Sequence, residues 1–502
     1  MIEALGIVAL PFLIAGAAMA RSRWKKPTTH GSAGWGAPPR SCTQPYEAGG
    51  FLLGEHRGRK VTLPRETAAQ HGVIIGGSGV GKSRGFFLPN AAAARGTSLV
   101  CTDPKGELWR HTSGFHDEAV RFAPGEPERS ACFNWIPLCR EARTAELCAR
   151  AIVESGNTQK TEQAWLDLEA AFLSALFSHA AYLSEPTPLT AYRLFTRQSQ
   201  EDLIEELLNS PSEAAQEQAQ IFQQTQERMR GSIVPVVAAR LQFLRDEAVA
   251  RFTSASVAAP DFSHLRERPI AVYWCLREQD IARLRPLTSV FFSLLLEQIA
   301  QEGEGAGTGA VPVVMLLDEF ANIGVIPHFE TTISVARGRG VSLWLGVQSL
   351  SQLSARYGKD NAQTILTNCG TKIALHGLDV ETAEYLSRTL GEGTVASKRR
   401  SSLRLFGLLP SVNVTVADQE TKRALLTSDE VRRIGDDAAI TVVGNLRPWL
   451  LTKRLYTDPP NEKRPPEAPL GTAQGLLPTR TADEEEPPPL PEMLRAPLLL
   501  LE

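Results

Sequence analysis

Residues 76–83 read Gly-Gly-Ser-Gly-Val-Gly-Lys-Ser, a spacing that suits the binding of a polyphosphate. The apolar run at residues 73–75 predicts a short strand that leads directly into them. Glycines let the backbone curl so that successive N–H groups point at phosphate oxygens. Lys82 can reach the terminal phosphates, and the Ser83 hydroxyl can ligate Mg²⁺. The sequence therefore predicts a nucleotide site whose residues are Gly76, Gly77, Ser78, Gly79, Val80, Gly81, Lys82 and Ser83.

Asp318 and Glu319 end a second apolar run, at residues 313–317. A strand here would bring Asp318 to Mg²⁺ through the water shell of the ion. It would also bring Glu319 to the water that attacks the γ-phosphate. Many strands end in acids at a turn, so the pair is informative because a phosphate loop precedes it. Adjacent acids favour a hydrolase over a kinase, since hydrolysis needs an activated water.

Arg337 and Gln348 complete the set of residues that could act on a nucleotide. Arg337 lies in Val-Ala-Arg-Gly-Arg-Gly and fits an arginine that acts in trans on a neighbouring subunit; the alternative is a solvated turn between glycines. Gln348 follows the apolar run at 342–347 and fits contact with the γ-phosphate or the attacking water. The alternative is a surface glutamine that caps a strand. The run Asp-Pro-Lys-Gly-Glu-Leu at 103–108 gains no role from its residue types alone.

Buried strands that alternate with helices must position these residues. Helical patterns cover residues 284–301 and 329–336, and residues 51–63 predict a β-hairpin. Apolar runs predict strands at residues 73–76, 98–102, 270–275, 313–317, 342–347, 371–376 and 440–443. This alternation predicts an α/β fold with a mostly parallel sheet that is covered on both faces.

Residues 186–257 are rich in Gln, Glu and Ala and carry little strand signal, so they predict an inserted all-α domain. Within this stretch, Ser210 is expected to cap a helix that has Pro211 at its first position. The block lies between two halves that contain strands. We therefore expect one nucleotide-binding domain in two parts, at 47–185 and 258–457, with the all-α domain between them.

The ends of the chain differ from its middle in composition. Residues 4–20 are apolar and are followed by a basic cluster with Trp24, which favours a membrane anchor at 1–26 with the bulk of the chain in the cytoplasm. A cleaved signal peptide is the alternative, although no basic residue precedes the apolar run. Residues 27–46 predict a flexible stalk, and residues 458–502 predict a disordered, acidic, Pro-rich tail.

Charge and cysteine content limit the partners and the compartment. The 502 residues carry a formal net charge of −3, so a surface that binds a polyanion must be local. Its best candidate is a stretch that predicts an exposed hairpin or loop, with Lys398, Arg399, Arg400 and Arg404. The alternatives are a solvated charged loop, or a path over the helical region at Arg228, Arg230 and Arg240. Seven scattered cysteines without a C-x-x-C pair argue against a disulfide framework and a zinc site.

Six segments together resemble the type IV secretion coupling proteins, the ATPases of conjugation. They are GGSGVGKS, TDPKGEL, LLDEFANIG, ARGRG, VQSLSQL and RALLTSDEVR, spread over residues 45–455. The resemblance implies a RecA-like motor domain interrupted by an all-α domain, an inner-membrane anchor and a homo-hexameric ring that uses ATP and Mg²⁺. Lys82, Ser83, Asp318 and Glu319 match the two Walker motifs of the family, Arg337 its arginine finger and Gln348 its sensor glutamine.

The resemblance also implies partners. These are single-stranded DNA with its relaxase and relaxosome, protein substrates, and the inner-membrane components of the secretion channel. The chain departs from the family in showing one apolar span where two are usual, and in a small helical insertion. Two related alternatives are a docking receptor that does not act as a motor and a septal-type DNA pump. An ABC-type ATPase or a small-molecule kinase fits less well, since the chain has no Ser-Gly-Gly-Gln signature.

Overall fold

One large sheet organises the chain in the computed structural model, which describes residues 29–156, 163–254, 260–301, 310–402, 414–457, 467–468 and 476. Eleven strands of this part of the chain form the sheet in the order β2-β1-β13-β12-β9-β3-β8-β7-β4-β6-β5. They are β1 (Phe51–His56), β2 (Arg59–Leu63), β3 (Gly72–Ile75), β4 (Ser98–Asp103), β5 (Ala119–Phe122), β6 (Ala271–Cys275), β7 (Val313–Leu317), β8 (Val341–Val347), β9 (Thr371–Ala374), β12 (Ala438–Val443) and β13 (Trp449–Thr452).

The mostly parallel sheet expected from the sequence is confirmed. The strands from β9 to β5 in this order run parallel, and β12, β13, β1 and β2 extend the sheet antiparallel. The expected hairpin is β1 and β2, with Phe51 opposite Leu63. Val73 and Ile75 belong to one hydrophobic core and Ile74 to the other. Both faces of the central strands are therefore buried, which explains their continuous apolar runs.

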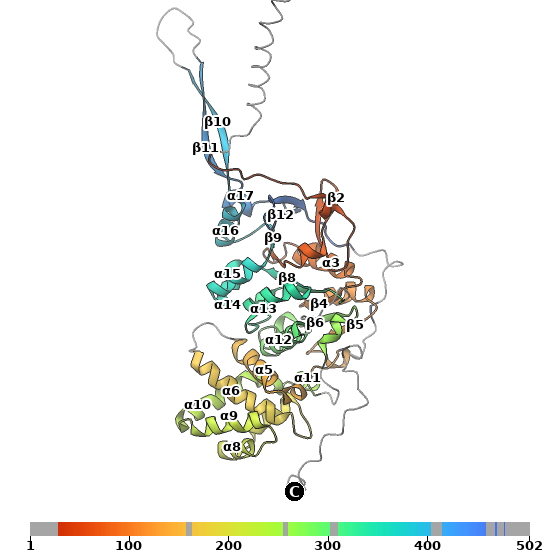
Figure 1. Ribbon diagram of the computed structural model, residues 1–502, viewed down its shortest axis with the longest axis vertical. Coiled ribbons are helices and arrows are strands. Elements are labelled where there is room, and N and C mark those ends of the chain that lie inside the picture. Colours follow the sequence, from red (N-terminus) through yellow and green to blue (C-terminus); the bar gives the residue numbers. More distant parts are fainter. Residues whose placement is uncertain are drawn as a thin grey trace, which may run out of the picture.

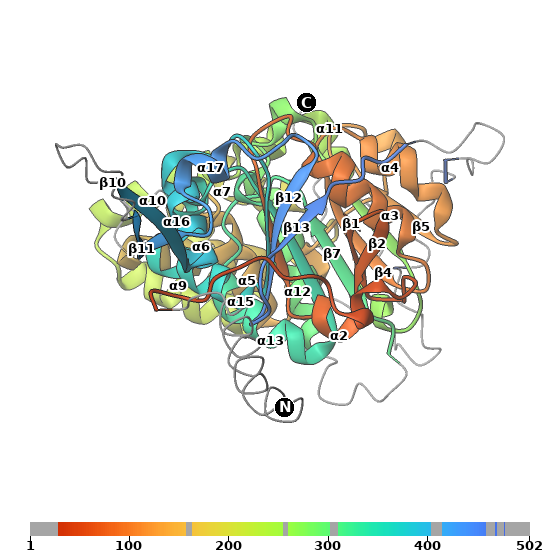
Figure 2. The same cartoon turned by 90° about the horizontal axis from the view of Figure 1, so that it is seen from above.

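Helices cover both faces of the sheet (Figures 1 and 2). α3 and α4 lie on the face of Ile74, and α5 and α12 to α16 lie on the face of Val73. The helices are α2 (Arg65–Ala68), α3 (Leu88–Ala93), α4 (Glu107–Thr112), α5 (Ala142–Glu154), α6 (Gln163–Ala180), α7 (Pro188–Thr196), α8 (Gln200–Leu208), α9 (Glu213–Gln224), α10 (Glu227–Arg240), α11 (Glu247–Phe252), α12 (Arg285–Gln301), α13 (Phe329–Ala336), α14 (Leu350–Tyr357), α15 (Lys359–Asn368), α16 (Val380–Leu390) and α17 (Ser428–Arg432).

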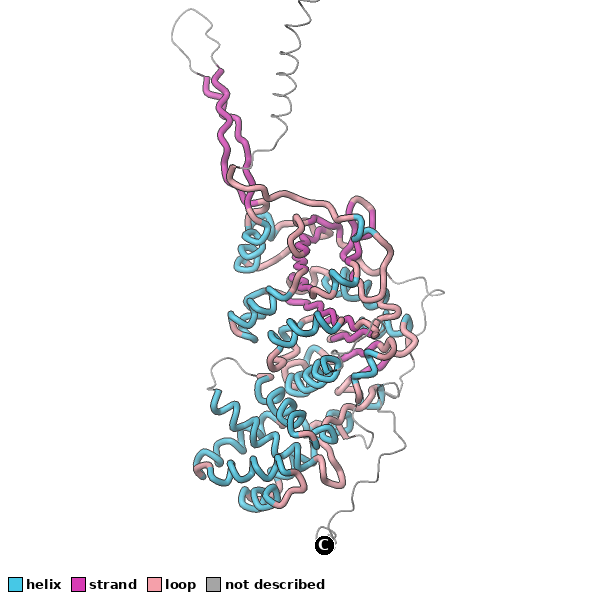
Figure 3. Tube along the Cα trace, viewed as in Figure 1, coloured by secondary structure: helices cyan, strands magenta, loops and turns pink. Residues whose placement is uncertain are grey.

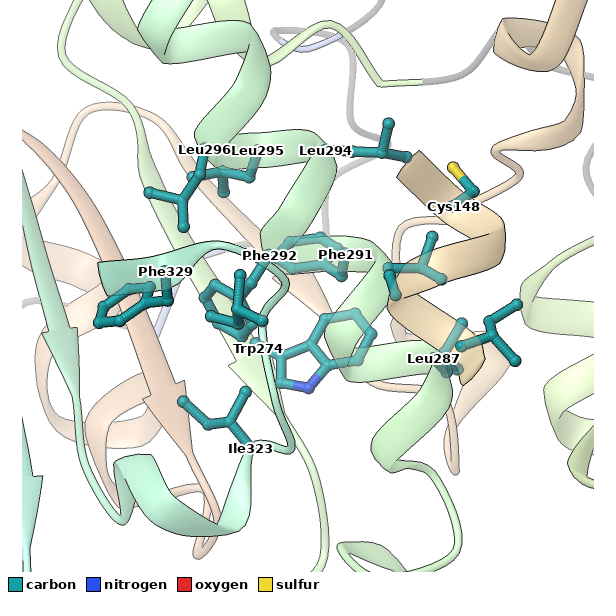
Figure 4. Packing of buried hydrophobic residues seen from close by; sticks show 14 of the residues in the cluster. Cys148, Trp274, Leu287, Phe291, Phe292, Leu294, Leu295, Leu296, Ile323 and Phe329 are labelled. Carbon is teal, nitrogen blue, oxygen red and sulfur yellow. The ribbon is translucent and has the colours of Figure 1, made fainter. Parts of the chain in front are cut away.

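Aromatic packing fixes α12 against the sheet (Figure 4). The rings of Trp274 on β6 and Phe291 on α12 have centroids 4.3 Å apart, and Phe291 also packs on Phe292. All three side chains are buried. Truncating a buried aromatic ring of this kind costs about 3–5 kcal/mol. This packing places the first turn of α12 beside the carboxyl ends of the parallel strands.

Between β5 and β6 the described chain is helical, and its helices gather at one end of the molecule (Figure 3). α6 lies before the expected boundary at residue 186, yet it packs on α9, where Phe172 and Phe222 stack with centroids 4.6 Å apart. The capping residue of α9 was predicted wrongly: Ser212, not Ser210, accepts the N–H of Ala215. The Ser210 hydroxyl instead hydrogen-bonds the Nδ1 atom of a buried histidine of α6.

A separate two-stranded hairpin, β10 (Glu392–Ser402) and β11 (Val414–Ala424), projects from the end of the molecule opposite helices α6 to α10 (Figure 1). Its base is tied to the start of the described chain, where the N–H of Ala33 donates to the Glu392 carbonyl at 3.1 Å. The N–H of Gly36 donates to the Pro448 carbonyl at 2.9 Å. Part of the segment expected to be a flexible stalk therefore makes fixed backbone hydrogen bonds.

The two ends of the chain are only partly described. Among the described residues, no helix has the length and apolar character needed to cross a bilayer, and the anchor predicted at residues 1–26 lies outside this part. Within the segment for which we expect a disordered tail, Glu467, Ala468 and Leu476 are described. Leu476 is fully buried, and its carbonyl accepts the N–H of Asp261 at 2.6 Å.

Candidate nucleotide site at the carboxyl edge of the sheet

The loop after β3 has the open curl that a phosphate cradle needs. Its backbone turns through Gly79, with φ +79°, and Gly81, with φ +89°, a conformation that residues other than glycine rarely adopt. A Cβ atom added to Gly79 would meet nothing within 4 Å among the described residues. The chain then becomes helical from Lys82 through η2 (Ser83–Phe87) into α3, as the sequence predicts. The loop thus lies at a helix N-terminus with one open side.

The Lys82 ammonium lies across the mouth of this loop. It donates to the carbonyl oxygens of Gly76 at 2.7 Å and Gly77 at 3.1 Å, and it lies 3.5 Å from Oε1 of Glu319. Only 5% of Lys82 is exposed. A buried cation needs such oxygen partners, and phosphate oxygens are stronger ones. The charge is therefore placed where a polyphosphate would take over its contacts.

Asp318 stands directly beside the loop at the end of β7. Its side chain accepts a hydrogen bond from the Ser83 hydroxyl, and its carbonyl accepts one from the Thr102 hydroxyl at 2.8 Å. The pKa of Asp318 is raised to about 6, chiefly by burial; the neighbouring Glu319 charge acts in the same direction, whereas the Ser83 hydrogen bond and the Lys82 charge oppose the rise. A carboxylate that is costly to ionise in the free protein gains most from a bound cation.

Glu319 is held in a strained and well-defined position. Its backbone has φ +53°, in the left-handed region that costs a non-glycine residue roughly 1–2 kcal/mol. Oε2 of its carboxylate accepts a hydrogen bond from the Gln348 amide at 2.8 Å, while Oε1 faces Lys82. Strain of this kind clusters at active sites, where the surrounding structure maintains it. The Gln348 side chain therefore contacts the acid directly.

These residues share one cavity of about 400 Å³ at the carboxyl ends of the parallel strands. Its lining includes Ser78, Ser83, Asp318, Glu319 and Gln348. The residues fit a nucleotide with Mg²⁺: the loop offers backbone donors and a lysine. Ser83 and Asp318 offer the oxygen ligands that a hard divalent cation prefers. The structure therefore brings together the predicted phosphate loop, both acids and the glutamine.

Arg285, the first residue of α12, lines the same cavity and was not found from the sequence. Its Nε atom is buried and has no hydrogen-bond partner within the described part of the chain. Burial lowers the pKa of Arg285, and the positive charge of Arg356 lowers it further. A guanidinium placed in this way adds positive potential to the wall of the cavity.

Asp103 explains part of the segment that the sequence left without a role. It ends β4, is 2% exposed, and accepts the N–H of Trp109 at 2.8 Å. Burial raises the pKa of Asp103, and the N–H groups of Trp109, Leu108 and Glu107 oppose the rise. The carboxylate therefore fixes the start of α4 beside the cavity. Thr102 was missed as well, although a polar residue at the end of a strand was a usable signal.

Arg337 does not reach the cavity of its own chain. It is exposed in η11 (Arg337–Arg339), which precedes β8, whereas the cavity lies beyond the other end of that strand. The seven residues of β8 span roughly 23 Å at about 3.3 Å per residue. His71 anchors this region: its Nε2 hydrogen-bonds the Ile333 carbonyl at 2.8 Å and its Nδ1 accepts the N–H of Leu343. Any contact of Arg337 with a nucleotide would have to be made in another subunit.

The basic residues proposed for DNA also lie away from the cavity. Lys398, Arg399 and Arg400 are on β10, and Asp418 is the register partner of Lys398. Arg404 lies outside the described residues. In the alternative path, Arg240 is engaged in the fold, because it donates to the Glu169 carboxylate and to a main-chain carbonyl of α5. Of the alternative path, Arg240 is thus held within the fold, whereas Arg228 is exposed.

A family model and several curated proteins match most of this chain. The family model described as Type IV secretory system Conjugative DNA transfer matches residues 29–474. The chain is 28% identical over 459 residues to the conjugal transfer protein TraG of Escherichia coli, a match that covers 81% of this chain and 71% of that protein. It is 26% identical over 436 residues to the protein VirD4 of Rhizobium radiobacter, of which it spans 61%, with 82% of this chain covered.

Solved structures of the plasmid coupling protein TrwB share the fold. The complex of TrwB with ADP and Mg²⁺ superposes with a TM-score of 0.67 at 18% identity, covering 86% of this chain and 95% of that one. The complex with the ATP analogue ADPNP gives 0.68 at 17% identity, covering 89% and 99%. The mixed α/β architecture with its large sheet is therefore that of TrwB.

Proposed function

The chain belongs to the type IV secretory system conjugative DNA transfer family, and from this premise we propose that it is an ATP hydrolase. The hydrolysis of ATP drives the transfer of single-stranded DNA, protein or both into a type IV secretion channel. The ligands named for TrwB, ADP with Mg²⁺ and a non-hydrolysable ATP analogue, are of the kind that this proposal assigns to the chain.

One observation carries the proposal: Asp318, Glu319 and Gln348 line one cavity, and Lys82 contacts Glu319 there, although these residues follow three different strands. Lys82 lies 3.5 Å from Glu319, and Gln348 lies 2.8 Å from the other oxygen of the same carboxylate. Nucleotide binding alone needs the loop, Ser83 and Asp318. An acid oriented by a glutamine beside the phosphate loop suits the activation of a water, so this arrangement favours hydrolysis over a docking receptor.

The position of each residue in the site suggests a separate role for it. Backbone N–H groups of residues 76–83 and the Lys82 ammonium would hold the phosphates, and Ser83 with Asp318 would hold Mg²⁺. The ion, when bound, screens the phosphate charge. Glu319 would take the proton of the attacking water, and Gln348 orients the Glu319 carboxylate toward it. The Asp318 carboxylate accepts hydrogen bonds from the Ser83 hydroxyl and from the N–H of Glu319, so it is the weaker candidate for proton transfer.

The finer parts of the proposal concern assembly. Arg337 is exposed at the edge of the sheet opposite the cavity, which suits a ring in which each subunit supplies this arginine to its neighbour. We propose a homo-hexamer anchored to the inner membrane by residues 1–26, with helices 186–257 as an inserted domain. Its partners would be relaxase, relaxosome and the inner-membrane components of the channel.

The experiment compares Lys82→Ala with Lys60→Ala, a lysine exposed on β2. Lys82→Ala should abolish ATP turnover and substrate transfer, since it removes the cation from the phosphate site. Lys60→Ala should leave both unchanged. Transfer at the wild-type rate by the Lys82→Ala protein would refute the motor function.

A further inference from the structure

A second buried lysine supports the phosphate loop from behind. Lys453 directly follows β13, on the antiparallel side of the sheet, and its side chain crosses to the loop after β3. Its Nζ donates to the Val80 carbonyl at 2.6 Å and to the Asp436 carbonyl at 2.8 Å. Lys453 is 7% exposed, and its own N–H donates to the Asp437 carbonyl at 2.6 Å. Lys453 lies more than 370 positions from the loop along the chain, and no sequence pattern indicated this contact.

Two glycines of the loop region make room for this side chain. A Cβ atom on Gly85 would lie 2.7 Å from Cγ and 2.8 Å from Cδ of Lys453, and one on Gly81 would lie 3.2 Å from its Nζ. Contacts under 3.0 Å are not tolerated by real Cβ atoms, so Gly85 is required by the lysine stem. The segment after Lys453 also contacts η2, the helical turn that follows the loop: the N–H of Tyr456 donates to the Arg84 carbonyl at 2.7 Å.

The geometry of a peptide links this contact to phosphate binding. In a trans peptide the C=O and the following N–H point in opposite directions within one plane. Fixing the Val80 carbonyl on Lys453 therefore turns the Gly81 N–H to the other side, away from Lys453. The ammonium also polarises the peptide, which strengthens that N–H as a donor. Gly81, with φ +89°, has no side chain to hold this orientation by itself.

We infer that Lys453 is a positioning residue of the phosphate loop, which holds the peptide between Val80 and Gly81 so that the Gly81 N–H is presented to a bound phosphate. The inference rests on the proposed nucleotide site. It gives the segment after β13 a part in nucleotide binding, although this segment does not line the cavity. It also accounts for the glycine at position 85, which lies outside the Gly-Lys-Ser signature itself.

The test measures the dissociation constants of ADP and of a non-hydrolysable ATP analogue in Lys453→Met, which keeps the apolar stem and removes the donors. Both should rise by about tenfold or more, the loss expected when a charged donor is removed from a buried carbonyl. Lys453→Arg should recover part of the affinity. The control is Arg454→Met, because the neighbouring Arg454 pairs with Glu55 at the surface. Its affinities should equal those of the wild type.

A second variant covers the case in which Lys453→Met fails to fold. Gly85→Ala pushes the lysine stem away and should weaken both nucleotides as well, and it should add little to Lys453→Met in the double variant. Lower stability with unchanged dissociation constants in either single variant would show a merely structural contact and overturn the inference. A wild-type protein that binds neither nucleotide would overturn the proposed function, and with it this inference.

Discussion

The Asp318 carboxyl group lies in an environment very different from water. It is 5% exposed, and burial raises its pKa to about 6. In the unfolded chain the same group ionises near pH 3.9. Its charge is therefore a cost to the free protein and becomes useful once a cation is bound.

This cost predicts a pH-dependent difference between the wild type and Asp318→Asn. Well below about pH 4 the carboxyl is protonated in both the folded and the unfolded states, so the two proteins should differ by a constant amount. As the pH rises toward 6, the unfolded wild type ionises first and gains stability, so the wild type should lose up to about 3 kcal/mol relative to the variant. Urea unfolding without metal or nucleotide measures this. A difference independent of pH between 4 and 7 would refute the assigned environment.

Substitution of Glu319 and substitution of Asp318 should affect different properties, turnover in the first case and nucleotide binding in the second. Glu319→Gln should still bind ATP and Mg²⁺ but lose about 10²–10⁴-fold in turnover, because it removes the proton acceptor and leaves Asp318 in place. Asp318→Ala should lose Mg²⁺-dependent nucleotide binding. Fluorescent-nucleotide titration and phosphate release measure the two properties separately. Equal loss of binding in both variants would contradict the division of roles.

At the scale of elements, the strands were more predictable than the contacts between them. Continuous apolar runs mark the parallel strands because both faces are buried, and the acids or glutamine that follow β7 and β8 point to the shared edge. Thr102 and Lys453 were missed because each contacts a residue distant in sequence. Arg285 was missed because its place in the cavity wall depends on how α12 packs. The cap of α9 was misplaced because Pro211 fits a first helical position, whereas Ser210 is used to bond a histidine of another helix.

The hairpin of β10 and β11 carries the prediction for substrate binding. Three basic residues of β10, together with Arg404 outside the described residues, would contact phosphates of single-stranded DNA, so binding should be independent of sequence and weaken with salt. Replacing them with Ser should reduce the slope of log affinity against log salt by up to about 3, at roughly 0.7 per phosphate contact. The replaced residues are Lys398, Arg399, Arg400 and Arg404. The variant should keep its ATP turnover without DNA.

A matched variant separates local contact from total charge. It removes four exposed basic residues outside the hairpin, namely Arg57, Arg59, Lys60 and Arg388. Its salt slope should stay at the wild-type value. If the hairpin variant also keeps the wild-type slope, the DNA path lies elsewhere on the molecule.

At the scale of the whole molecule, the account depends on where Arg337 lies. The family assignment from the sequence is confirmed, whereas the ring itself stays a prediction. Arg337 is exposed beyond the amino end of β8, while the cavity lined by Glu319 and Gln348 lies beyond the carboxyl end of that strand. In the proposed ring, one chain would offer one part of the site at each edge of its sheet. Head-to-tail packing of identical subunits would complete both.

The central claim is that one site, completed by a neighbouring subunit, hydrolyses ATP. Its most direct test mixes Lys82→Ala with Arg337→Ala, each inactive alone, and measures ATP turnover of the mixture after co-assembly is shown by differently tagged subunits. In random rings roughly a quarter of the interfaces join an intact phosphate loop to an intact arginine. The account predicts that turnover returns in the mixture and peaks near equal proportions. Co-assembled mixtures that remain as inactive as either variant alone would contradict it.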